Sequence, residues 1–177
     1  MESPSSKPLL EVWMRRIQLF CAISMSLCSA LASASQATGA ATLPADLRSH
    51  LEKERFQIVT SIRGLPLGVR EMLQTMFGNG TLDIANPGVP FQEPGVAVDS
   101  TLPLRRLIAA GCSGDFHCLV YYERGGSSHT WHVALFHWTP AETRLEWGAT
   151  APGNLKTVED VQKSILSGVI KDQSRFW

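Results

Sequence analysis

Residues 104–147 read LRRLIAAGCSGDFHCLVYYERGGSSHTWHVALFHWTPAETRLEW, and this segment carries the clearest structural pattern in the 177-residue chain. Four runs rich in β-branched, aromatic and aliphatic residues alternate with short groups of turn-forming residues, which is typical of strands joined by tight connections. Strands joined this closely pair antiparallel. The segment therefore predicts a four-stranded antiparallel meander, with strands at residues 104–112, 116–124, 129–138 and 143–147.

Segments with helical patterns precede and follow the meander in the sequence. Residues 44–55 begin with a proline in what would be the first turn. Residues 66–77 carry apolar side chains at helical spacing, and Gly78 follows where a helix end is favoured. A third helix is expected to begin at Thr157, whose side chain can form a capping box with Asp160 three residues later.

The first part of the chain has the order of a secretory signal peptide. A basic pair at residues 15–16 precedes an apolar run at residues 17–31, and small residues follow at 32–34. We expect a cleavable signal peptide at residues 1–34, with Met14 as an alternative functional start. An uncleaved anchor is the other interpretation, but a segment this short barely crosses about 30 Å of hydrocarbon. The product would be exported, periplasmic or extracellular, without a stable membrane span after processing.

The remaining chain is expected to fold as one domain. Residues 35–43 are mostly small and predict a flexible linker. Residues 44–177 then form a single globular α+β domain, since a chain of this length can bury about two thirds of its unfolded surface. The predicted fold class is α+β, a four-stranded antiparallel meander packed against about three helices.

Two cysteines, Cys112 and Cys118, follow the predicted cleavage site. In an oxidising compartment a pair at this spacing predicts a disulfide, here across the neck of a hairpin. The alternative is a thiolate nucleophile at either cysteine, paired with His117.

Composition and motifs exclude several function classes. The chain has 16 basic and 16 acidic residues, a balance that does not favour nucleic acid as a partner. It contains no Gly-x-Ser-x-Gly, no His-Glu-x-x-His and no phosphate-binding loop. No cofactor is therefore expected.

The histidines of the third predicted strand do not predict a metal site. His132 would point away from His129 and His137, and these two would lie about 26 Å apart on an extended strand. Adding Asp115 or His117 from the hairpin tip gives at most an accidental pair, so no metal ligands are expected.

Alternation along the strands assigns Tyr121, His132, Phe136, Trp138 and Trp147 to one face of the sheet. The opposite face is apolar as well, so either helices cover both faces or one face contacts a partner. Aromatic residues with a few polar groups are favoured at the centres of interfaces. We therefore expect a binding or inhibitor-like protein whose aromatic face contacts a protein or a small molecule.

Two other functions remain open. One is a small secreted or periplasmic hydrolase with a cleft around Tyr121, Glu123 and His132. The other is an envelope-associated structural protein that forms a homodimer through its apolar face.

Overall fold

The computed structural model describes residues 43–78, 80–95, 99–114 and 116–171. The predicted signal peptide, residues 1–34, and nearly all of the predicted linker, residues 35–43, lie outside this part. All described residues belong to one compact unit, Gly39–Trp177.

A five-stranded antiparallel sheet forms the centre of this unit, with the strands side by side in chain order. The strands are β1 (Phe56–Ile58), β2 (Arg105–Ser113), β3 (His117–Arg124), β4 (Thr130–Trp138) and β5 (Thr143–Thr150). The α+β class is confirmed, but the predicted count of four strands is wrong by one. The extra strand, β1, pairs with the end of β2. No local pattern indicates that pairing, because its two strands lie far apart in the sequence.

Three α-helices accompany the sheet close to their predicted positions: α2 (Ala45–Lys53), α3 (Leu67–Phe77) and α4 (Val158–Leu166); a short 3₁₀-helix, η2 (Ile62–Gly64), precedes α3. Gly78 ends α3 at φ 69°, a left-handed conformation that glycine adopts without strain. Thr157 and Asp160 form the predicted capping box at the start of α4. In the described part of the chain, no helix combines the length and apolarity needed to cross a membrane.

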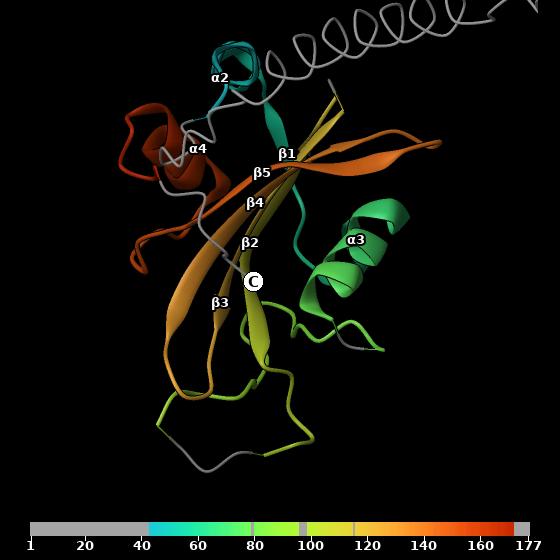
Figure 1. The fold of residues 1–177 in the computed structure, drawn as a ribbon, viewed down its shortest axis with the longest axis vertical. Coiled ribbons are helices and arrows are strands. Elements are labelled where there is room, and N and C mark those ends of the chain that lie inside the picture. The colour runs from blue at the N-terminus through green and yellow to red at the C-terminus, as the bar shows by residue number, and fades with distance from the viewer. Residues whose placement is uncertain (1–42, 79, 96–98, 115, 172–177) are drawn as a thin grey trace, which may run out of the picture. The chain divides into compact units, whose positions relative to one another are not determined.

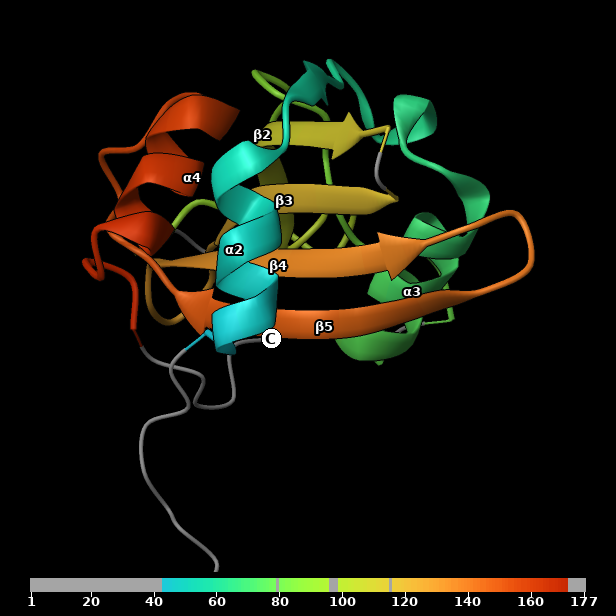
Figure 2. The ribbon, with the colours of Figure 1, turned by 90° about the horizontal axis from the view of Figure 1, so that it is seen from above.

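Helices cover both faces of the sheet, with α3 on one side and α2 and α4 on the other (Figures 1 and 2). The core on the α3 face includes Val69, Leu73, Val120, Tyr122 and Phe136. The core on the α2/α4 face includes Leu51, Tyr121, Leu135, Trp147 and Val161. The sheet is therefore the middle layer of three, which explains why its strands are apolar on both faces.

The register of β3 and β4 differs from the predicted one. Val120 opposes Ala134, so these two side chains share the α3 face. The predicted assignment placed His132, Phe136 and Trp138 on the face of Tyr121 instead, and it is wrong by one residue. A one-residue shift exchanges the two faces of a strand, and the connection at residues 125–129 does not by itself fix the register.

A β-bulge in β5 also changes which face of the sheet its side chains occupy. Leu135 opposes Trp147 and Phe136 opposes Leu145, which leaves Glu146 as the extra residue. As a result Leu145 packs on the α3 face while Trp147 packs on the α2/α4 face. The predicted placement of Trp147 on one face with Phe136 and Trp138 is therefore wrong.

The predicted disulfide is confirmed. Cys112 and Cys118 are directly opposite each other at the neck of the β2–β3 hairpin, with the sulfurs 2.05 Å apart. Both sulfurs are used in the bond, so neither is available as a thiolate nucleophile in this state. A disulfide indicates an oxidising environment.

Candidate metal centre

The five side chains that were predicted to form one binding face are divided between the two faces of the sheet. Tyr121 and Trp147 belong to the core under α2 and α4, while Phe136, Trp138 and His132 lie on the α3 side. Tyr121, Phe136 and Trp147 are at most 1% exposed. The expectation of one exposed aromatic face is therefore wrong, because the register shift and the bulge redistribute these residues and the helices cover them.

The predicted hydrolase cleft does not assemble either. Tyr121 donates a hydrogen bond to the carbonyl of Pro152 at 2.5 Å, and burial together with Glu123 raises the pKa of Tyr121 to about 12. His132 lies on the opposite face, stacked on Tyr122, and burial lowers the pKa of His132 to about 4. The sheet itself thus separates His132 from Tyr121 and Glu123, which share the other face.

Helix α2 lies across one face of the sheet (Figure 2). A cleft of about 480 Å³ lies beside it, near the β2–β3 turn. It is lined by Pro44, Asp46, Leu47, His50, Phe116, His117, His137, Arg144 and Glu146. Three of these side chains, those of His117, His137 and Glu146, come from three adjacent strands and lie close together at its wall.

The antiparallel register brings these three side chains together. His117 at the start of β3 is directly opposite His137 near the end of β4, with ring centroids 5.6 Å apart. The bulge residue of β5, Glu146, faces the same cleft. One ligand atom from each of His117, His137 and Glu146 lies within 4.8 Å of the other two. These three residues form the trio.

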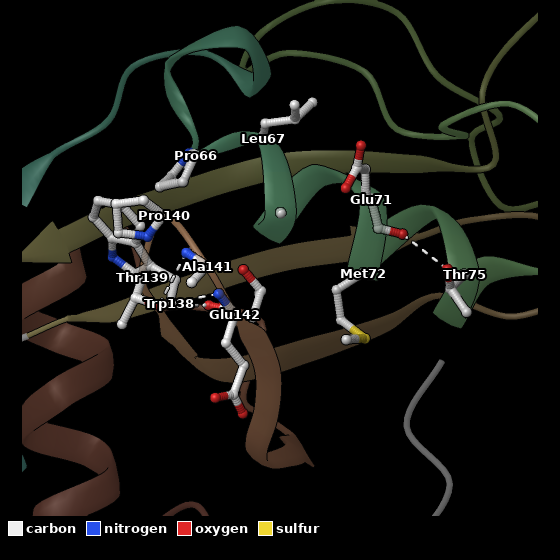
Figure 3. A pocket seen from close by; sticks show the side chains of 12 residues that line it. Pro66, Leu67, Glu71, Met72, Thr75, Trp138, Thr139, Pro140, Ala141 and Glu142 are labelled. Carbon is white, nitrogen blue, oxygen red and sulfur yellow. Dashed lines mark hydrogen bonds between the residues drawn. The ribbon is translucent and has the colours of Figure 1, made fainter.

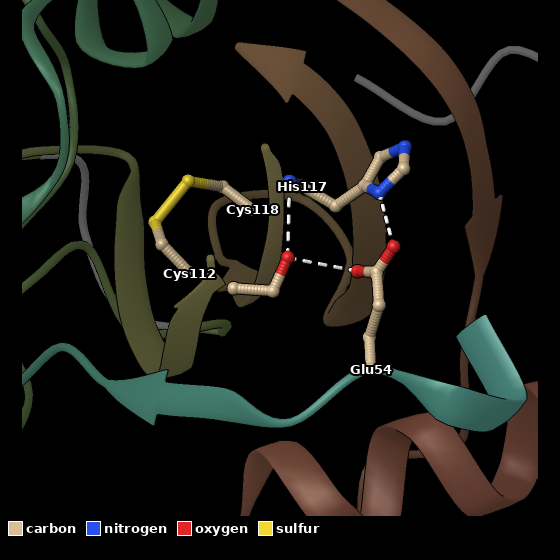
Figure 4. Close-up of a disulfide and its surroundings, with 5 residues drawn as sticks. Glu54, Cys112, His117 and Cys118 are labelled. Carbon is tan, nitrogen blue, oxygen red and sulfur yellow. Dashed lines mark hydrogen bonds and ion pairs between the residues drawn. A yellow bond between two sulfur atoms is a disulfide. The ribbon is translucent and has the colours of Figure 1, made fainter. Parts of the chain in front are cut away.

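A buried carboxylate holds His117 from the far side of its ring (Figure 4). Glu54, directly after α2, is 5% exposed, and its Oε1 lies 2.5 Å from His117 Nδ1. The Ser113 hydroxyl donates to Glu54 Oε2 at 2.9 Å and accepts from the His117 backbone N–H at 3.2 Å. Gln162 of α4 donates to the Glu54 carbonyl at 3.1 Å. Because Nδ1 faces Glu54, Nε2 is the nitrogen of His117 that remains for another ligand.

Two further groups border the trio. Arg144 Nη2 lies 2.6 Å from Glu146 Oε1, and a carboxylate has a second oxygen that can bind another ligand. His50 is exposed on α2, and its ring centroid lies 6.1 Å from that of His117.

This arrangement has the chemistry of a transition-metal site. Imidazole nitrogens and carboxylate oxygens bind Zn²⁺ at about 2.0–2.2 Å, so adjacent ligands of a tetrahedral ion lie about 3.3 Å apart. The trio reaches that spacing if its atoms approach by about 1.5 Å or less, and His137 and Glu146 are partly exposed and able to rotate. Metal-bound histidines almost always donate their second N–H to a carboxylate, a backbone carbonyl or a water, and Glu54 occupies this position beside His117.

A second cavity, of about 430 Å³, lies between α3 and the β4–β5 connection (Figure 3). Trp138 lines it together with Leu67, Glu71 and Met72. The indole Nε1 of Trp138 is buried, with no hydrogen-bond partner among the residues that the structure describes. Of the five residues predicted to bind a partner, Trp138 is thus placed beside a space that a ligand can enter.

The sequence pattern does not reveal the trio, because His137 is too far from His129 along one strand and His117 was expected to add at most an accidental pair. The ligands instead come from one position on each of three strands, and only the register shows that His117 meets His137. A local signal was present in Ser113 and His117, which flank the predicted hairpin tip, but Glu54 lies some 60 residues away.

Comparison of the chain with protein-family models, curated proteins and solved structures finds no match.

Proposed function

We propose that the protein binds a divalent transition-metal ion through His117, His137 and Glu146. The observation that carries the proposal is the buried contact between Glu54 and His117 Nδ1, which directs His117 Nε2 away from Glu54. Imidazole with carboxylate suits Zn²⁺ and Cu²⁺, whereas Mg²⁺ and Ca²⁺ prefer oxygen ligands.

A purely structural ion pair is the competing explanation for Glu54 and His117. A buried pair needs no further groups once both carboxylate oxygens are bonded, and those of Glu54 are bonded to His117 and Ser113. The additional presence of His137 and Glu146 within ligand distance favours the metal.

We place this function outside the cytoplasm. The disulfide fits an oxidising compartment, and the apolar segment at residues 17–31 fits a signal peptide. The finer location, periplasmic or extracellular, and the cleavage after residue 34 are parts of this proposal, to be tested by the intact mass of the exported protein.

Zinc titration of the purified, oxidised protein tests the proposal. We expect one equivalent of Zn²⁺ to bind, and we expect His137→Ala and Glu146→Gln to weaken binding at least about 10-fold. His129→Ala is the matched control, because His129 lies beyond the other end of the β3–β4 pair and contacts Glu123. Equal zinc affinity of the wild type and His137→Ala would refute the metal centre.

A second binding function is favoured by the cavity beside Trp138. Its unpartnered indole and apolar wall suit a small molecule or a peptide side chain, in line with the expectation of a binding protein. Trp138→Ala should weaken capture of a partner from the exported fraction by about 2 kcal/mol, compared with Val169→Ala at another exposed apolar position. Equal capture by both variants contradicts this role.

A further inference from the structure

Helix α2 borders the centre without contributing one of the three ligands. It presents Asp46 and His50, four residues apart and thus on one side of the helix, to the cleft that His117 and His137 also line. The same helix leads directly into Glu54, which holds His117. A change in the coordination of a bound metal would therefore alter the contacts of α2.

The ring of His50 already lies at nearly the spacing of a co-ligand. Two imidazoles bound to one tetrahedral ion have ring centroids about 5.2 Å apart, given metal–nitrogen distances of about 2.0–2.1 Å. The centroid separation is 6.1 Å between His50 and His117, and 5.6 Å between His117 and His137. The two pairs thus differ by half an ångström.

A side-chain rotation is sufficient to bring His50 into the centre. His50 is not part of the group whose ligand atoms lie within 4.8 Å of one another, so its present rotamer is not the coordinating one. The side chain is exposed, and no hydrogen bond holds its ring among the described residues. Nothing that the structure describes opposes the rotation.

Building on the proposed function, we infer that His50 is the fourth ligand of the bound ion and that the ion fastens α2 to the sheet. Four protein ligands, three imidazoles and one carboxylate, leave no open coordination position for a substrate or a reactive water. The centre is then a binding centre, and its donor set favours Zn²⁺ or Cu²⁺ over Mg²⁺, Ca²⁺ and Mn²⁺.

Hydrogen bonds attach α2 to α4, since Arg48 donates to the carbonyl of Leu166 and Gln162 donates to the carbonyl of Leu51. Pro44 precedes α2 and supplies no side-chain cap, and the buried contacts of the helix are those of Leu47 and Leu51. A metal bond at His50 would attach the last turn of α2, next to the fixed Glu54.

Asp46 is the alternative fourth ligand, because it lines the same cleft one turn earlier on α2. An aspartate ligand would give two imidazoles and two carboxylates. Asp46→Asn and His50→Ala therefore form a matched pair of variants that alter the same helix face. The two alternatives for the fourth ligand predict opposite results for this pair.

Three measurements on the purified, disulfide-intact protein test the inference. Zn²⁺ titration measures affinity, the visible spectrum of the Co²⁺-loaded protein reports coordination number, and amide exchange of α2 with and without Zn²⁺ reports fastening of the helix. We expect His50→Ala to weaken Zn²⁺ binding at least about 10-fold, to change the Co²⁺ spectrum and to abolish the zinc-dependent protection of α2. Asp46→Asn should resemble the wild type in all three.

The outcomes separate this inference from the function on which it rests. Wild-type affinity and spectrum in His50→Ala, with loss of binding in His137→Ala, would overturn the role of His50 and leave the metal centre standing. A loss confined to Asp46→Asn would also overturn it. Absence of Zn²⁺ and Cu²⁺ binding in the wild type would refute both.

Discussion

At the scale of single residues, the position of Glu54 is the feature on which the centre depends most. Its carboxylate is buried, both of its oxygens are bonded, and it contacts the nitrogen of His117 that does not face the cleft. Such a partner sets the orientation and the tautomer of a histidine ligand. Glu54 is therefore a positioning residue that acts through His117.

Glu54→Gln preserves the size of the side chain but removes its charge. We expect zinc affinity to fall about 10- to 100-fold, as for other partners of ligating histidines. The free energy of unfolding should fall by about 1–3 kcal/mol, because a buried hydrogen-bonded group loses part of its partners. Zinc titration and urea unfolding measure the two effects. Glu52→Gln, an exposed residue of α2 that pairs with Arg48, is the control, and similar affinities of both variants would show that Glu54 is only structural.

The buried His132 is expected to make the free energy of unfolding depend on pH. Burial lowers the pKa of His132 from 6.5 to about 4. Between these two values the unfolded chain binds a proton that the folded protein does not, so stability is lost as the pH falls from about 6.5 to about 4. The loss can reach about 3 kcal/mol. Urea unfolding across this range should show it, and His132→Gln should flatten this part of the profile; an unchanged slope in the variant contradicts the assignment.

At the scale of elements, the β2–β3 hairpin joins the disulfide to the centre. Cys112 precedes Ser113 and Cys118 follows His117, so the bond closes the hairpin directly beside two members of the Glu54 network. The covalent link lies on the α3 face and the network lies on the other, on opposite sides of the same strands (Figure 4).

Replacing both cysteines by alanine should therefore have two effects. The free energy of unfolding should fall by about 2 kcal/mol, the value that chain entropy gives for so short a loop. Zinc affinity should also fall, since Ser113 and His117 lose the constraint on their spacing. Calorimetry and zinc titration of the double variant check this, with reduced wild-type protein as a second comparison. Unchanged zinc affinity would mean that the strand pairing alone positions His117.

The same elements show what the sequence could and could not predict. α3, α4 and their ends follow from helical spacing, Gly78 and the Thr157 cap, because these signals are local. The faces of β4 and β5 do not follow, because register and the bulge at Glu146 depend on partners elsewhere in the chain. The meeting of the proposed metal ligands depends on both the register and the bulge. The centre could therefore not be predicted, although each ligand residue is present in the sequence.

At the scale of the whole described unit, the sheet separates two cores, and the centre lies on the α2/α4 side. A metal that binds only the folded state stabilises the whole unit, since the unfolded chain does not preserve the cleft.

We expect Zn²⁺ at 100 times its dissociation constant to raise the free energy of unfolding by about 2.7 kcal/mol. The melting temperature should rise with zinc concentration and return to its starting value after chelation with EDTA. Thermal unfolding of the wild type and of His137→Ala measures this, and the variant should not respond. An equal shift in both proteins would place the zinc elsewhere.

The strand order also determines when the centre can assemble. His117, His137 and Glu146 belong to three consecutive strands joined by short turns, so contacts between neighbours along the chain are enough to bring the trio together. His50 and Glu54 come from a segment that precedes β2 by about 50 residues and must cross the loop-closure barrier of a distant contact. During folding, the strand ligands are therefore expected to meet first, and the arrival of α2 completes a site whose first half already exists.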